Sequence, residues 1–331
     1  YDPCCGSGGM FVQSAKFVDA HQGNRKEITI YGQENSPKSY RLARMNLAIR
    51  GLSCDLGEEN ADSFLHDLHP KLLADYILAN PPFNLKAWRT EKQLTEDDRW
   101  KGYATPPVGN ANYAWILHML SHLSYDGTAA FLLANGALNA GVEGEAEYEI
   151  RKKLIQDNKV EAIIVLPRDM FYATDISVTL WLCGNHKKAK KVRRNGTEVM
   201  LRNRENEILF IDAREMGDNG ANDDGFTLLP EESKERIINT VFAWQSEDYR
   251  TYYHNIPEFC YSATIQEIKK KNYALSPSKY IKFVTSDNDI DYQKEMLSLQ
   301  KELTQLSQKM KEGQFALAKA MEEIGYAIDK S

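Results

Sequence analysis

Four consecutive residues of an unusual kind, Asn80, Pro81, Pro82 and Phe83, follow directly after an apolar run. The two prolines stiffen the backbone and remove two N–H donors, so the Asn80 side-chain oxygen and the Pro81 carbonyl form a fixed pair of acceptors. Such a pair suits the two hydrogens of a planar amino group, while the Phe83 ring offers a face for stacking. The run therefore indicates chemistry at an exocyclic amine; a rigid turn with a polar cap is the alternative.

A second group of residues lies at the start of the chain, where Asp2 precedes a turn that contains Gly6 and Gly8. Glycines after a strand let the backbone approach a ligand closely, and Glu34, at the end of the next apolar run, can accept hydrogen bonds from two ribose hydroxyls. The loop has neither the Gly-Lys-Ser/Thr end of a P-loop nor the Gly-x-Gly-x-x-Gly pattern. It favours a nucleoside ligand over a plain tight turn.

The elements that must position these residues alternate between short apolar runs and amphipathic stretches, as in βα units. The predicted strands are 28–32, 75–79, 128–133, 160–166 and 177–183, and the predicted helices are 10–20, 37–50 and 145–157. Near-continuous apolar strands are typical of a parallel sheet covered on both faces, so we predict a doubly wound, mostly parallel α/β domain. Residues 84–111 are dense in charge, tryptophan and proline, which predicts a functional or mobile loop.

Length and composition limit the class of protein. The chain has 331 residues, 42% hydrophobic and 27% charged, which excludes disordered, collagenous and mini-protein classes. At about 150 residues per domain, this length predicts roughly two domains. We expect a core over 1–212, an acidic mixed extension over 213–285 and a helical tail over 286–331. The net charge of −6 excludes an autonomous basic DNA clamp.

The five cysteines are scattered, without a Cys-x-x-Cys pair or a histidine at metal-ligand spacing. We therefore predict no disulfide framework, no metal site and a reducing, cytoplasmic location. No run of about 18 apolar residues and no basic-then-apolar leader occurs, so no membrane partner is expected. The chain begins without Met, directly before the glycine turn, and we expect it to be a fragment.

Together these motifs resemble the modification (methyltransferase) subunit of type I restriction-modification systems, a family of adenine-specific, S-adenosylmethionine-dependent DNA methyltransferases. The resemblance covers nearly the whole chain, through segments 2–11, 32–35, 42–47, 80–83, 109–115, 133–138, 166–174, 257–260 and 275–280. It implies the fold of class I S-adenosylmethionine-dependent methyltransferases with a carboxyl-terminal helix. The family also carries an amino-terminal helical domain and a cofactor-pocket segment before the glycine loop, so we expect weak or no methylation by this chain, even with its partner present.

The resemblance implies roles for single residues around the cofactor. The implied cofactor residues are Asp2, Gly6 and Gly8 at the methionine end, Glu34 at the ribose, and Asp62 and Phe64 at the adenine. An ordinary aspartate at the start of a loop is the alternative for Asp62.

Around the target base, Asn80 to Phe83 would carry the catalysis, and Phe83 and Phe171 would pack against a flipped adenine; a buried core residue is the alternative for Phe171. The Asn80 amide has no useful pKa, so its role would be orientation and electrostatic stabilisation.

Partners are implied as well. In the family a specificity subunit reads double-stranded DNA, two modification subunits flank it, and a restriction subunit can join. The heptad pattern from Met296 to Ile324 predicts a helix that docks on the specificity subunit, or one packed on its own domain. A basic run is either a phosphate-contacting patch or a solvated hairpin tip before Asn195-Gly196: Lys187, Lys188, Lys190, Lys191, Arg193 and Arg194.

Two other functions remain open. Asn-Pro-Pro also occurs in methyltransferases that act on an RNA base or a protein glutamine amide, although Phe83, the Gly-Gln-Glu-Asn stretch at 32–35 and the heptads favour DNA. A non-catalytic cofactor-binding scaffold is the second alternative, and the intact run from Asn80 to Phe83 argues against it.

Overall fold

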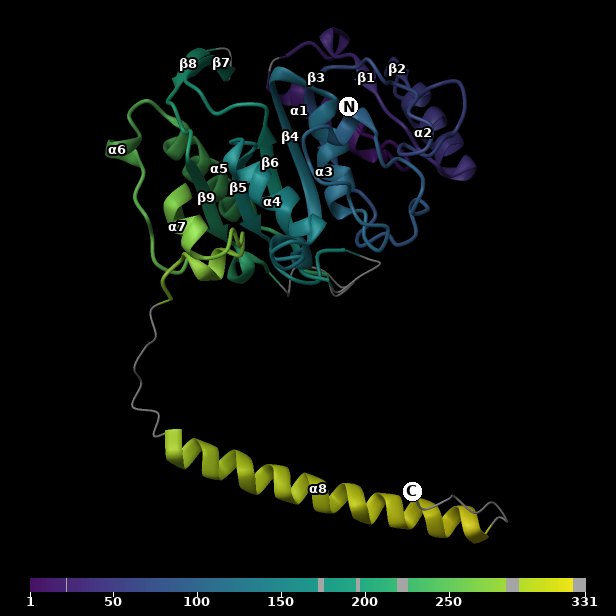
Figure 1. Cartoon of the computed structure of the whole chain (residues 1–331), viewed down its shortest axis with the longest axis vertical. Helices are drawn as coiled ribbons and strands as arrows, with labels where there is room; N and C mark the ends of the chain where they lie inside the picture. The colour runs from purple at the N-terminus through teal and green to yellow at the C-terminus, as the bar shows by residue number, and fades with distance from the viewer. Residues whose placement is uncertain (22, 172–175, 195–196, 219–225, 284–291, 324–331) are drawn as a thin grey trace. The chain divides into compact units, whose positions relative to one another are not determined.

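The computed structural model describes all residues except 22, 172–175, 195–196, 219–225, 284–291 and 324–331. The chain forms two compact units, Tyr1–Phe283 and Val284–Ser331 (Figure 1). The first is a layered α/β unit, and the described part of the second is one long helix, α8, Tyr292–Glu323.

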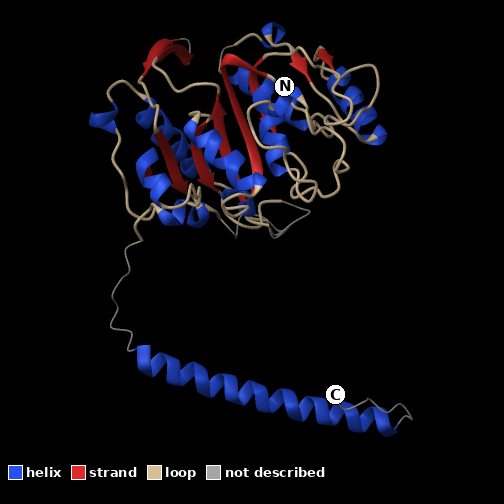
Figure 2. Ribbon diagram, in the orientation of Figure 1, coloured by secondary structure: helices blue, strands red, loops and turns tan. Residues whose placement is uncertain are grey.

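A six-stranded sheet forms the centre of the first unit (Figure 2), in the order β10-β9-β5-β6-β4-β3. Its strands are β3 Ala74–Ala79, β4 Leu123–Ala134, β5 Val160–Val165, β6 Val178–Gly184, β9 Glu207–Asp212 and β10 Cys260–Thr264. β3 pairs in parallel with β4, and β5 with β9, whereas β6 and β10 run antiparallel to their neighbours. The predicted mostly parallel sheet is confirmed.

Two residues at the start of the chain extend this sheet beyond β3. Strands β1, Ile30–Tyr31, and β2, Cys54–Asp55, form a parallel pair. Between β1 and β3, Leu78 N donates to Tyr1 O (3.1 Å) and Asp2 N donates to Tyr31 O (3.1 Å). Parallel strands end at the same edge of a sheet, so the residues that follow β1, Asp2 and β3 lie next to one another.

Helices cover both faces of the sheet. They are α1 Gly9–Ala20, α2 Pro37–Ile49, α3 Asn112–Ser121, α4 Ala146–Gln156, α5 Glu231–Gln245, α6 Tyr249–Tyr252 and α7 Ile265–Lys270, with 3₁₀ turns at Arg25–Glu27, Asp98–Trp100, Asn135–Leu138, Arg214–Met216 and Pro277–Lys279. Alternate residues of β9 point to opposite cores: Phe210 packs with residues of α3, α4 and α7, and Ile211 with residues of α5. This arrangement is the doubly wound fold expected from the sequence.

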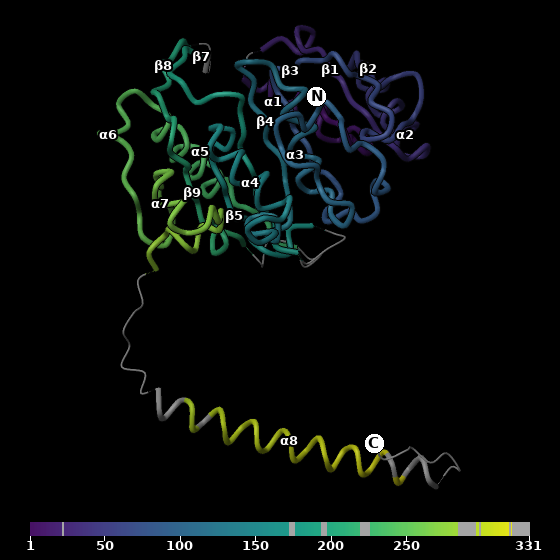
Figure 3. Tube along the Cα trace, in the orientation of Figure 1, coloured from purple at the N-terminus to yellow at the C-terminus, as the bar shows by residue number. Residues whose placement is uncertain are grey.

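The connection from β3 to α3, traced in Figure 3, contains the long loop 84–111. The loop is ordered by its own tryptophans, because Trp88 and Trp100 are both buried in the main core. Trp88 Nε1 donates to Pro107 O (2.8 Å), and Trp100 Nε1 donates to Leu94 O (2.8 Å). A loop of this length is therefore held in place by burial of large apolar side chains rather than by regular secondary structure.

Residues beyond 212 contribute to the same unit as those before it. α5 packs on the sheet and β10 pairs with β9, so the described part of segment 213–283 continues the core. The basic run forms the hairpin β7, Lys190–Arg194, and β8, Thr197–Leu201; its Asn195-Gly196 tip lies outside the described residues. The domain boundaries at 212 and 285 stay a prediction.

Helix α8 carries the predicted heptad pattern. Its apolar side chains Met296, Leu299, Leu303, Leu306, Met310 and Leu317 are all exposed, and Ile324 lies outside the described residues. Among the residues that the structure describes, no helix combines the length and apolar character needed to cross a membrane.

Candidate active site

The glycine loop leads from Asp2 into α1. Gly6 and Gly8 have positive φ angles, +55° and +74°, a region that favours glycine. A side chain at Gly8 would contact Leu47 and Ala43 of α2, whereas the position of a Cβ on Gly6 has no atom within 4 Å. Gly8 thus allows close helix packing, and Gly6 leaves its backbone open to a ligand.

Glu34 lies against this loop, as the sequence predicts. Gly6 N donates to Glu34 Oε2 (2.9 Å), and Ser36 N donates to Glu34 Oε1 (2.7 Å). Each carboxylate oxygen has two lone-pair sites, so the half-buried Glu34 can still accept hydrogen bonds from hydroxyls. Its position fits a residue that holds a ribose.

Asp2 is a buried carboxyl, only 3% exposed. Burial raises its pKa to about 6, against the hydrogen bond that it accepts from Cys4 N (3.0 Å), and the charge of Glu34 adds to the rise. Asp2 and Glu34 together give the loop a negative potential that favours a cationic ligand.

The Asp62 turn joins the glycine loop from another part of the chain. Asp62 Oδ1 accepts hydrogen bonds from Phe64 N (2.8 Å) and Leu65 N (3.1 Å), and Ser63 Oγ donates to Pro3 O. The turn therefore stands beside the loop that begins at Asp2.

Phe64 is positioned differently from its predicted role. Its side chain is 2% exposed, and its ring packs against Trp88 and Trp115, with centroid distances of 4.5 Å and 4.2 Å. Almost no ring surface is free for an adenine. The geometry fits a core residue under the turn, and stacking on the cofactor has no support from it.

Asn80 follows β3 at the same sheet edge. It is exposed, with Pro81 buried and Pro82 exposed beside it. The segment after Phe83 is fixed by side-chain amides: Asn84 N donates to Asn112 Oδ1 (3.1 Å), and Asn112 Nδ2 donates to Asn84 Oδ1 (2.9 Å). Asn84, whose φ is +53°, thereby anchors the run to the start of α3.

Phe83 and Phe171 meet although they are distant in sequence. Their ring centroids are 6.4 Å apart with an interplanar angle of 77°, an edge-to-face contact between half-buried rings. Phe171 comes from the connection between β5 and β6. The structure thus brings together both residues predicted to pack on a target base.

Comparison with known proteins agrees with this geometry. A family model described as N-6 DNA methylase matches residues 1–289. The chain belongs to the N-6 DNA methylase family. It is 39% identical over 98% of its length to the "Type I restriction enzyme HindI methylase subunit" of Haemophilus influenzae, and covers 68% of that protein. It is 34% identical over 92% of its length to the MjaIX methylase subunit of Methanocaldococcus jannaschii, and covers 52% of that protein.

Solved structures show the same fold. The type I restriction-modification methyltransferase subunit from Streptococcus thermophilus superposes with a TM-score of 0.69 at 25% identity, covering 86% of this chain and 53% of that one. The EcoKI M protein superposes with a TM-score of 0.58 at 18% identity, covering 94% of this chain and 68% of that one, which shows the fold. The chain thus spans between about half and two thirds of these relatives.

The expected family and fold are confirmed, and both imply S-adenosylmethionine as the cofactor. The residues present fit such a molecule. The open backbone at Gly6 allows close approach of the ligand, and Glu34 can accept further hydrogen bonds from ribose hydroxyls. The negative potential of Asp2 suits a sulfonium.

The basic run of the chain requires one correction. Lys187 is 1% exposed, and its Nζ donates to Val160 O (2.9 Å) and Glu207 O, so it is a core residue that cannot reach a phosphate. Burial lowers its pKa to about 8. Lys190 Nζ donates to Asp126 O (2.7 Å) and Lys191 pairs with Glu198 (3.0 Å), while Lys188 is exposed. The side chains of Arg193 and Arg194 lie outside the described residues.

Two residues near the site that the motifs did not indicate are Arg99 and His118. Arg99 Nη1 donates to Ser63 O (2.7 Å), directly after Asp62, and the ring of fully buried His118 is 3.1 Å from both Arg99 and Tyr1. For Arg99 the only signal in the sequence was the density of charge and tryptophan in the loop 84–111, and the motifs gave none for His118 in α3.

Proposed function

We propose that this chain transfers a methyl group from S-adenosylmethionine to the exocyclic amine of an adenine flipped out of double-stranded DNA. The observation that carries the proposal is the adjacency of two strand ends: Leu78 N donates to Tyr1 O (3.1 Å), so Asp2 with its glycine loop and Asn80 with its prolines follow neighbouring parallel strands. A loop suited to a nucleoside and a pair of acceptors suited to an amine share one edge.

When bound, S-adenosylmethionine supplies a methyl group that its sulfonium already activates. The Asn80 side-chain oxygen and the Pro81 carbonyl accept the two amine hydrogens, which directs the nitrogen lone pair toward the cofactor. Asn80 cannot act as a base, so it works by orientation and by stabilising the positive charge that develops on the amine.

Phe83 and Phe171 hold the extruded base on this proposal. Flipping a base costs a few kcal/mol, by the usual unstacking estimate, and stacking on aromatic rings offsets part of that cost. Both rings are half-buried in the apolar cluster around β5 and β9, which fixes them while part of each ring stays accessible.

Asp2, Glu34 and Asp62 hold the cofactor on this proposal. Asp2 faces the methionine end, where its charge complements a sulfonium; Glu34 accepts the ribose hydroxyls; Asp62 accepts the adenine amine. Asp2 accepts a hydrogen bond from Cys4 N, Glu34 from Gly6 N and Asp62 from Phe64 N. These bonds support the proposed roles, because they orient the three carboxylates before a ligand binds.

We further propose that the chain acts as the modification subunit of a type I complex in the cytoplasm, with a specificity subunit, a second modification subunit and, where present, a restriction subunit. The net charge of −6 supports this, since most of the grip on DNA must then come from partners. Five free cysteines support a reducing compartment. Among the described side chains of the basic run, exposed Lys188 remains a candidate for a local phosphate contact.

The catalytic assignment is tested with Asn80→Ala, assayed together with the specificity subunit on DNA by digestion with a methylation-sensitive nuclease. We expect methylation to fall by at least about 10²-fold, while calorimetry shows unchanged binding of S-adenosylmethionine. Asn203→Ala, which removes an exposed amide far from the site, is the control and should methylate normally. An active Asn80→Ala enzyme would refute the assignment.

The apolar seam of α8 is the proposed docking surface for the specificity subunit. Deleting residues 290–331 should abolish co-purification with that subunit because the exposed heptad side chains are lost. Binding of S-adenosylmethionine should persist, since the first unit has its own core. Unchanged complex formation by the shortened chain would show that α8 is not the docking element.

A further inference from the structure

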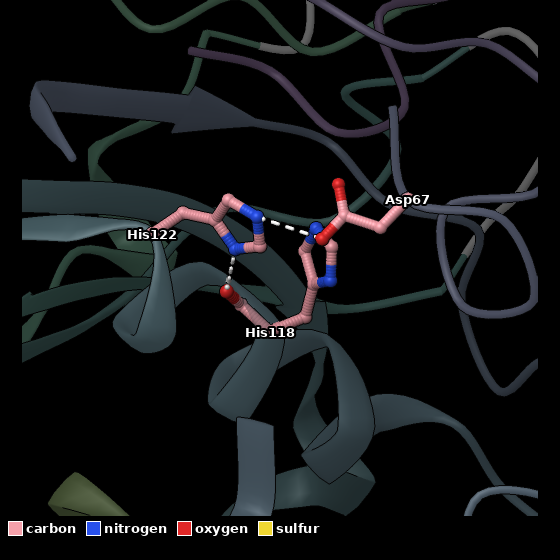
Figure 4. A group of neighbouring side chains, drawn as sticks. All are labelled: Asp67, His118 and His122. Atoms are coloured by element: carbon pink, nitrogen blue, oxygen red, sulfur yellow. Dashed lines mark hydrogen bonds and ion pairs between the residues drawn. The ribbon is translucent and has the colours of Figure 1, made fainter. Parts of the chain in front are cut away.

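Three residues with metal-binding side chains lie close together away from the proposed reaction centre. The ligand atoms of Asp67, His118 and His122 are all within 4.8 Å of one another, and Figure 4 shows the two imidazoles and the carboxylate facing one another. His118 and His122 come from α3 and the residue after it, one turn apart. Residue type alone would favour a divalent cation here.

The hydrogen bonds of His118 argue against a cation. Arg99 Nη1 lies 3.1 Å from His118 Nδ1, and a guanidinium can only donate, so Nδ1 is an acceptor. Burial, with His122 and Arg99 nearby, lowers the pKa of His118 well below its ordinary value, which leaves the ring neutral. Its one proton is therefore on Nε2, 3.1 Å from the Tyr1 hydroxyl. Neither ring nitrogen retains a lone pair for a metal.

The cluster is instead the outer part of a network centred on Arg99. The Arg99 side chain is 11% exposed and pairs with Asp97, Nε to Oδ1 at 2.7 Å and Nη2 to Oδ2 at 2.7 Å. The remaining donors go to Ser63 O, Phe64 O and His118. All of the hydrogen-bonding edges of the guanidinium are thus used, and in a fixed fork geometry.

The partners of Arg99 belong to both walls of the proposed cofactor site. Ser63 and Phe64 form the turn that Asp62 begins. Through His118, Arg99 reaches Tyr1, the residue directly before Asp2. Arg99 itself lies in the loop 84–111, which starts after Phe83 and ends at α3.

We propose that Arg99 is a positioning residue for methyl transfer: by holding the Asp62 turn and, through His118, the Tyr1–Asp2 segment, it sets the geometry of the cofactor site. It does not touch the reacting atoms. This inference rests on the proposed function, since it assumes that these two segments bind S-adenosylmethionine.

The chain provides a matched control in Arg89, a buried arginine of the same loop. Arg89 donates to Thr90 O (2.9 Å), Gln93 O (3.2 Å) and Pro106 O (2.7 Å), all within the loop 84–111. Loss of either guanidinium leaves buried carbonyls without a donor and destabilises the loop. Only the loss of Arg99 removes the hydrogen bonds to the Asp62 turn and to His118 that hold the two segments of the proposed cofactor site.

The experiment compares Arg99→Gln, Arg99→Lys and Arg89→Gln, with calorimetric titration of S-adenosylmethionine into each chain and steady-state kinetics in the presence of the specificity subunit. We expect Arg99→Gln to raise the Kd and the KM for S-adenosylmethionine between about tenfold and a hundredfold, with the KM for DNA unchanged. Arg99→Lys should recover part of the loss, and Arg89→Gln should bind the cofactor like the wild type. Equal cofactor affinity of Arg99→Gln and the wild type would overturn the proposal, and so would an equal loss in Arg89→Gln.

The outcomes separate this inference from the function on which it rests. Binding of S-adenosylmethionine without any methylation of DNA by the complete type I complex would contradict the proposed function, while the calorimetric comparison still decides the role of Arg99. If Arg99→Gln does not fold, Asp97→Asn decides, because it keeps Arg99 and removes its charged partner: a several-fold higher Kd supports the proposal, and an unchanged Kd overturns it.

Discussion

The cofactor side and the target side of the candidate site are built in different ways. On the cofactor side, Asp2, Glu34 and Asp62 each accept hydrogen bonds from backbone N–H groups within the site. On the target side, Asn80 is exposed and Phe83 is half-buried. One side is fixed by its own polar contacts, and the other presents groups that stay accessible.

This difference follows from what each side would have to do. In the absence of a ligand, the carboxylates need hydrogen bonds from the protein, because an unpaired buried charge is costly. The same hydrogen bonds orient them for the ligand. A target base enters and leaves in every turnover, so its acceptors must be free until it arrives, and only their backbone is rigid. Prolines 81 and 82 and the Asn84–Asn112 amide pair provide that rigidity without occupying the Asn80 side chain.

Replacement of Asp2 tests the cost of burying a carboxylate on the cofactor side. Its expected effect is larger than that of the aromatic replacements on the target side. Folding raises the pKa of this carboxyl to about 6, chiefly by burial, so the folded chain holds its proton to a higher pH than the unfolded chain does. The free energy of unfolding therefore falls as the pH rises from about 4 through about 6. Asp2→Asn should remove this fall and be more stable at pH 7 by roughly 2–3 kcal/mol, from a shift of about two pKa units.

The measurement is urea unfolding of both chains at pH 4.5 and pH 7, in the absence of cofactor. Asp248→Asn, which removes an exposed carboxylate, controls for the loss of one negative charge. The gain in stability should be accompanied by weaker binding of S-adenosylmethionine. A stability difference between Asp2→Asn and wild type that does not change with pH would mean that the carboxyl is not strained.

Much of the fold and of the site could be predicted from local sequence. Strands β3, β5 and β6 are near-continuous apolar runs, interrupted by Asp75, Glu161 and Thr179. The two prolines in the run from Asn80 to Phe83 predict a rigid backbone there. The prediction that Glu34 and the glycine loop share one nucleoside site needed only one rule, that neighbouring parallel strands end at one edge.

Other features depend on contacts between distant residues and could not be predicted. Lys187 looked like its basic neighbours, but the fold places its Nζ against carbonyls of β5 and β9. From the sequence, Phe64 could face a cofactor or the core. Its ring contacts with Trp88 and Trp115, which are distant in sequence, place it in the core. The positioning role proposed for Arg99 depends on hydrogen bonds to the carbonyls of Phe64 and Ser63, which are 35 and 36 residues away in the sequence. Residue type sets what a side chain can do, and tertiary structure sets whether it is free to do it.

The aromatic pair tests the target side and has a smaller expected effect. Phe83→Ala and Phe171→Ala should each lower kcat/KM for DNA methylation by about tenfold, as expected for loss of one stacking surface, and leave cofactor binding unchanged. Because the rings are 6.4 Å apart, the double variant should show a coupling of about 0.5–1.5 kcal/mol. Phe17, an exposed ring on α1, replaces Phe171 in the control cycle and should show no coupling with Phe83. Strict additivity of Phe83 and Phe171 would mean that they act on the base separately, whereas a change in cofactor affinity would mean that the two sides of the site are not independent.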